Sequence, residues 1–133
     1  VDIEVGAVIL APGGEIIDPQ LKQELGYGRY PNVISSLQFE RLLSASGPHL
    51  GTVLRPSDCK PPKKIAFIQC VGSRDFQLGN NYCSAACCMY GIKEAVIAKE
   101  HSATPLDCTI FYMDMRCYGK GLFISLNDSA FFG

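Results

Sequence analysis

The chain has 133 residues, of which 47% are hydrophobic and 19% charged, and its formal net charge is -1. These values predict a soluble domain with room for a core and exclude a disordered tail. The twelve basic residues are scattered and are balanced by thirteen acidic ones, so we expect no nucleic-acid partner. No apolar run approaches the ~20 residues of a membrane-spanning helix, so we also expect no membrane span.

The first residues have the composition of a buried strand. Positions 3–10 are rich in β-branched residues and run into the turn-forming sequence Ala11-Pro12-Gly13. The N-terminus lacks a methionine and a basic signal region, so we expect an internal segment of a longer protein. With no secretory signal and an odd number of cysteines, seven, a cytoplasmic location is expected.

The region from 15 to 47 is predicted to hold one loop and one short helix. Prolines and glycines punctuate residues 15–32, which indicates an ordered, aperiodic connection. Ser35 is a candidate N-cap with Gln38 at the capping-box position, and Gly47 ends the helix that follows. Four prolines between 48 and 62 then indicate a connector.

The second half has the pattern of a βαβ unit. An apolar run at 64–69 predicts a buried strand, helical spacing of apolar residues predicts a helix over 84–101, and residues 108–113 predict a second strand. Such a unit pairs its strands in parallel and carries its functional edge where the first strand meets the helix. Beyond Gly119 no period is evident, although residues 123–126 have the composition of a strand.

Four of the seven cysteines fall at this functional edge. Cys70 follows the first strand, while Cys83, Cys87 and Cys88 fall on the predicted first turns of the helix, where Cys83 and Cys87 would share a face. Free N–H groups at a helix N-terminus favour thiolates. The spacing favours a [4Fe–4S] cluster but leaves open a zinc site, a redox-active dithiol or unrelated core thiols. Three further cysteines are interpreted as ordinary thiols: Cys59, Cys108 and Cys117.

The chain resembles the family of heterodisulfide reductase A subunits over roughly residues 3–121. The most specific run is Gln69-Cys70-Val71-Gly72-Ser73-Arg74-Asp75, which is followed by Tyr82-Cys83-Ser84 and Cys87-Cys88-Met89-Tyr90. The family's pattern is also matched by Gly26-Tyr27-Gly28-Arg29-Tyr30 and by Phe39-Glu40-Arg41-Leu42-Leu43.

This resemblance implies an oxidoreductase subunit that transfers electrons between FAD and partner iron–sulfur subunits. It implies a [4Fe–4S] cluster held by Cys70, Cys83, Cys87 and Cys88, and an FAD contact at Ala11, Pro12 and Gly13, although Pro12 replaces the family's threonine. The partners it implies are other heterodisulfide-reductase-type iron–sulfur subunits and an electron-donor protein. Because the loop after the first strand lacks G-x-G-x-x-G, no NAD(P)H binding is expected.

The fold class expected from these observations is α/β, a fragment of a flavoprotein with two dinucleotide-binding domains. Residues 1–47 would form a partial rim of the FAD-binding domain, and 48–62 a connector. Residues 63–121 would form a Rossmann-like iron–sulfur domain, and 122–133 a tail unlike the family. The competing hypothesis is a zinc-stabilised binding module without redox chemistry.

Overall fold

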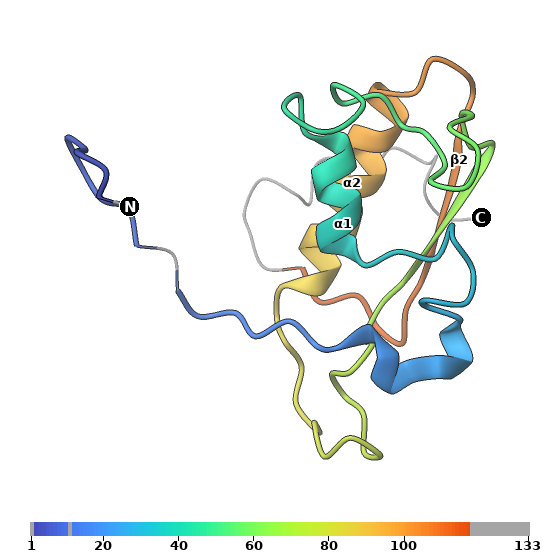
Figure 1. Ribbon diagram of the computed structural model, residues 1–133. Coiled ribbons are helices and arrows are strands. Elements are labelled where there is room, and N and C mark those ends of the chain that lie inside the picture. The colour runs from blue at the N-terminus through green and yellow to red at the C-terminus, as the bar shows by residue number, and fades with distance from the viewer. Residues whose placement is uncertain (1, 11, 118–133) are drawn as a thin grey trace.

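The computed structural model describes residues 2–10 and 12–117. Within that part of the chain the elements are the 3₁₀ helix η1 (Pro19–Leu25), α1 (Ser36–Leu43), β1 (Lys64–Ile68), α2 (Cys87–Glu100) and β2 (Asp107–Phe111). The two strands pair in parallel, with Lys64 opposite Asp107 and Ile68 opposite Phe111. The predicted βαβ unit is therefore confirmed, and α1 and α2 lie side by side next to the sheet (Figure 1).

The start of α1 is fixed by the predicted capping box. Gln38 donates its backbone N–H to the Ser35 hydroxyl at 3.3 Å, and its Oε1 accepts the Ser35 N–H at 2.9 Å. The helix ends at Leu43, earlier than expected, because Ser44 is already extended, at φ -69° and ψ 136°. Gly47 therefore belongs to the turn that follows, where its N–H donates to the Ser44 carbonyl at 2.8 Å.

The core lies between the two α-helices and one face of the sheet. Its buried side chains are Phe39 and Leu43 of α1, Ala98 of α2, and Val53 and Leu106 from the connections. The Phe39 ring meets the Phe67 ring edge-on at 5.7 Å, which joins α1 to β1. This packing attaches the first half of the chain to the βαβ unit.

The sheet is covered on one face only in the described residues. Ile65 and Phe67 of β1 are half-buried against the core, whereas Ala66 and Ile68 are exposed. The expectation of a fully buried strand is wrong here, because alternate residues of a strand face opposite sides and the helices cover a single side.

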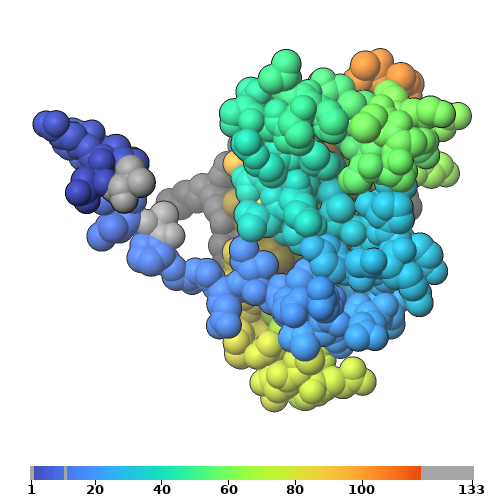
Figure 2. Space-filling model, viewed as in Figure 1, coloured from blue at the N-terminus to red at the C-terminus, as the bar shows by residue number. Residues whose placement is uncertain are grey.

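The N-terminal segment projects from the body of the molecule (Figures 1 and 2). Residues 2–10 pair with no strand of the described part, and Ile9 and Leu10 are 92% and 82% exposed. The prediction of a buried strand at 3–10 is therefore wrong for this structure. A strand needs neighbouring strands to satisfy its N–H and C=O groups, and the described residues offer none to this segment.

The connection predicted as aperiodic contains η1. Asp18 caps it by accepting the Gln20 N–H at 2.9 Å, and Pro19 occupies its first position. An acidic cap followed by proline is a helix-start signal that the sequence carried. The predicted strand at 123–126 and the tail 122–133 lie outside the described residues. No helix among residues 2–10 and 12–117 has the length and apolar character needed to cross a bilayer.

Candidate metal centre

The segment between β1 and α2, residues 69–86, is here called the thiol loop. It begins where the strand ladder ends, since the Gln69 N–H still donates to the Phe111 carbonyl at 2.9 Å. Three of its non-glycine residues have left-handed backbones: Cys70 (φ 60°), Arg74 (φ 56°) and Ala85 (φ 60°). Such conformations are uncommon for residues with a Cβ and cluster at functional sites. The thiol loop is therefore a strained segment at the edge that the sequence singled out.

Contacts with the N-terminal half hold the thiol loop in place. Asp75 and Asn80 exchange N–H···O bonds of 2.8 and 3.0 Å, which closes a small hairpin. The Asp75 carboxylate pairs with Lys22 of η1, and both side chains are only 13% exposed. This pair lowers the pKa of Asp75 and raises that of Lys22, chiefly through the hydrogen bond between them. The Lys22–Asp75 ion pair thus connects η1 to the thiol loop.

The helix begins later than the sequence predicted. α2 starts at Cys87 rather than at 84, because Ala85 is left-handed and interrupts the helical backbone before it. Cys83 consequently lies in the thiol loop, and the expectation that it shares a helix face with Cys87 is wrong. The Cys83 sulfur instead accepts the Ala85 N–H at 3.3 Å.

Three of the four candidate ligands come close to one another. Cys70 interacts electrostatically with both Cys87 and Cys88, and the Cys70 backbone lies close enough to the Cys87 thiol to lower its pKa. Cys88 is buried, the other candidates are half-buried, and the Cys88 sulfur accepts the Arg116 N–H at 3.4 Å. Cys117 also interacts with Cys87 and Cys88, although the sequence presented it as an unrelated thiol. All seven cysteines are free thiols.

The surroundings push the thiol pKa values in different directions. Burial raises the pKa of Cys70, and the hydrogen bond from Arg74 only partly offsets this effect. Burial also acts on Cys87, but hydrogen bonds from Ser84, the Cys70 N–H and Cys88 outweigh it and lower its pKa. The lowered pKa of Cys87, at the first position of α2, favours its thiolate form.

The donor set is compatible with a four-iron cluster. Among the described residues no three His, Cys, Asp or Glu side chains converge on one ion-sized position. A four-iron cluster binds each thiolate at a separate corner, several ångströms from the next, so it does not require that convergence. Backbone N–H groups already donate to the sulfurs of Cys83 and Cys88, and such bonds stabilise the negative charge of iron–sulfur centres.

The expected FAD contact is only partly described. Pro12 and Gly13 are exposed and Ala11 lies outside the described residues. A Cβ built at Gly13 would meet nothing within 4 Å, so no close backbone approach is made there. The contact of these residues with FAD stays a prediction.

A second feature, which sequence reasoning missed, is a buried carboxyl group between the helices. Glu94 is 4% exposed and its Oε1 has no hydrogen-bond partner among the described residues. It borders a cavity of about 340 Å³, together with Glu40, Tyr90 and His101. Burial, with a contribution from Glu40, raises the pKa of Glu94 to about 8. Its position in the apolar stripe of α2, six residues after Cys88, was the available signal.

Curated proteins with similar sequences are heterodisulfide reductase subunits. No family model matches the sequence. The chain is 51% identical over 121 residues to the A subunit of the H(2):CoB-CoM heterodisulfide,ferredoxin reductase of Methanothermobacter marburgensis. It is 55% identical over 122 residues to an iron-sulfur A subunit, numbered 2, of the CoB–CoM heterodisulfide reductase of Methanopyrus kandleri.

A third relative is the A subunit of the ferredoxin/F(420)H(2)-dependent CoB-CoM heterodisulfide reductase of Methanosarcina acetivorans, at 47% identity over 120 residues. These alignments cover 90–91% of this chain but only 15–18% of the relatives' own lengths. Over about nine tenths of its length the chain is therefore similar to one segment of heterodisulfide reductase A subunits, which are longer proteins.

Proposed function

We propose that this chain is the cluster-binding segment of an electron-transfer subunit of the heterodisulfide reductase A type. The observation that carries the proposal is the gathering of Cys70, Cys87 and Cys88 where β1 ends and α2 begins. Several relatives are named as iron-sulfur subunits, which supports the same assignment.

The proposed ligands of a [4Fe–4S] cluster are Cys70, Cys83, Cys87 and Cys88. A bound cluster would supply one-electron transfer at low potential. The chain's own part is to present two thiols from the thiol loop and two from the first residues of α2, to donate N–H groups to the sulfurs of Cys83 and Cys88, and to place the positive end of α2 beside them. Backbone N–H groups and the helix N-terminus would thus stabilise the negative charge of the thiolates.

In the intact protein we place FAD close to the cluster, with Ala11, Pro12 and Gly13 as part of its contact surface. Electrons would then pass between the flavin and iron–sulfur subunits of the heterodisulfide reductase type, with an electron-donor protein as a further partner. The relatives' names mention hydrogen, ferredoxin and F420H2, which supports a role in electron transfer. We place the protein in the cytoplasm, in keeping with its free thiols.

Anaerobic purification with iron, sulfide and zinc analysis tests the proposal. Each of C70S, C83S, C87S and C88S should lower bound iron sharply, because a hydroxyl is a poor ligand for iron in place of a thiolate. C59S is the matched control, since Cys59 is exposed and belongs to another loop. Cys117 is unsuitable as a control because it lies beside Cys87 and Cys88.

Two results would contradict the proposal. A colourless protein with stoichiometric zinc would favour the binding module without redox chemistry. Equal iron in all four variants and in C59S would show that these thiols are not the ligands. Electron paramagnetic resonance of the dithionite-reduced protein identifies the type of cluster.

A further inference from the structure

Two arginines share one aspartate beside the candidate ligands. The Arg74 guanidinium, in the thiol loop, pairs with the Asp114 carboxylate, and Arg116 Nε contacts the other oxygen of that carboxylate at 3.0 Å. The three side chains are 24%, 47% and 40% exposed in the order Arg74, Asp114, Arg116. Asp75, the neighbour of Arg74 in the sequence, pairs with Lys22 instead.

This trio, Arg74, Asp114 and Arg116, lies next to the candidate thiols. Arg74 lies close enough to Cys70 to lower the pKa of its thiol, against the larger opposite effect of burial. Arg74, Arg116 and Cys83 also line a common cavity of about 280 Å³. The backbone on both sides takes part, since the Arg116 N–H donates to the Cys88 sulfur and the Asp114 carbonyl lies 4.0 Å from it. The segment after β2 is thereby joined to the thiol loop by charge and by hydrogen bonds.

We infer that Arg74, Asp114 and Arg116 form a charge-setting unit that positions Cys70 and tunes the reduction potential of the proposed cluster. The inference rests on the proposed function, because it concerns the same four thiols. Arg74 is a positioning residue in this assignment and not a ligand.

The sign of the effect follows from charge alone. One-electron reduction adds one negative charge to a centre that already carries thiolates, so nearby positive charge stabilises the reduced form. The trio has one net positive charge, since two guanidinium groups face one carboxylate. Removing Arg74 should lower the reduction potential, whereas neutralising Asp114 should raise it. A merely structural loss would not move the two variants in opposite directions.

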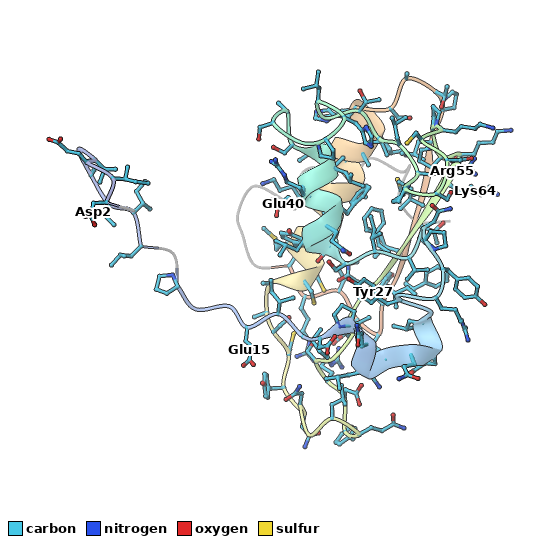
Figure 3. The ribbon with its side chains drawn as sticks, viewed as in Figure 1. Asp2, Glu15, Tyr27, Glu40, Arg55 and Lys64 are labelled. Carbon is cyan, nitrogen blue, oxygen red and sulfur yellow. The ribbon has the colours of Figure 1, made fainter. Side chains whose placement is uncertain are left out.

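The experiment is a dithionite redox titration of the anaerobically purified full chain, followed by electron paramagnetic resonance. The variants are R74Q and D114N, and R55Q is the matched control. Arg55 forms its own pair with Asp58 at 2.6 Å. In Figure 3 it is drawn, like Lys64 at the start of β1, well away from the end of β1 that leads into the thiol loop. The length of β1, about 16 Å, separates the Lys64 end of the strand from Cys70.

The expected result is a midpoint potential that falls in R74Q, rises in D114N and is unchanged in R55Q, with iron content retained in D114N and R55Q. If R74Q loses its cluster, the inference is tested by D114N alone, whose midpoint potential should rise. Shifts of the same sign in both variants, or none in D114N, would overturn the inference while leaving the proposed function intact. A wild-type chain without iron would instead overturn the proposed function.

Discussion

Replacing Glu94 by glutamine should make the chain more stable at neutral and higher pH but not in acid. The carboxyl group is 4% exposed, its Oε1 has no partner among the described residues, and its pKa is raised from 4.5 to about 8. The folded state thus keeps a proton that the unfolded state has lost. Stability therefore falls as pH rises from 4.5 towards 8, the reverse of the usual effect of a salt-bridged carboxylate.

The size of the effect follows from the shift. At about 1.4 kcal/mol for each pH unit, it corresponds to about 3–5 kcal/mol once the folded carboxyl is ionised. Glutamine is close in shape and does not titrate, so E94Q should remove the pH-dependent part and leave only the constant cost of a buried amide.

Urea denaturation of both proteins at several pH values, in the same metal-loading state, measures the difference. E100Q serves as the control because Glu100 is an exposed glutamate on the same helix. We expect the advantage of E94Q over the wild type to be smallest below pH 4.5 and to grow to several kcal/mol near pH 8. An advantage that does not change with pH, or one shared by E100Q, would refute this account of the cavity.

Three further outcomes are expected from the packing and the caps. G47A should lose at least about 1–3 kcal/mol in thermal unfolding, because its Cβ would overlap the carbonyls of Arg41 and Ser44; G14A, with nothing within 4 Å, should be near neutral. S35A should cost about 1 kcal/mol in the same assay through loss of the capping box, and S35T should restore most of it. K22M should speed amide exchange at Asn80 by releasing Asp75 from η1, an effect that wild type should approach as acid protonates Asp75. Unchanged exchange in K22M would show that this ion pair does not hold the thiol loop.

Short-range sequence signals predicted the elements whose causes are themselves local. The capping box at Ser35 and Gln38 predicted where α1 begins, and the structure shows both of its hydrogen bonds. The apolar runs that became β1 and β2, with a helix between them, predicted the parallel pair. In each case the deciding interaction lies within a few residues or follows from the period of apolar side chains.

Errors arose where distant parts of the chain decide the outcome. The apolar composition of residues 3–10 indicated burial, but burial depends on neighbouring strands that the described residues do not provide. The start of α2 was placed three residues too early, because a left-handed backbone at Ala85 is uncommon and has no sequence signature. The capping signal of η1 at Asp18 was present in the sequence but was not used.

The sequence by itself determined which residues are chemically equipped for the site: four cysteines at a fixed spacing around a strand–helix junction, in a run that resembles heterodisulfide reductase A subunits. Only the tertiary structure decided which groups surround them. It separated Arg74 from Asp75 and paired it with Asp114, it brought Cys117 to Cys87 and Cys88, and it buried Glu94 between α1 and α2. The physical reason is that ligand identity is encoded in the type and spacing of neighbouring residues. Charge pairing and desolvation depend instead on residues that are far apart in the chain and meet only when it folds.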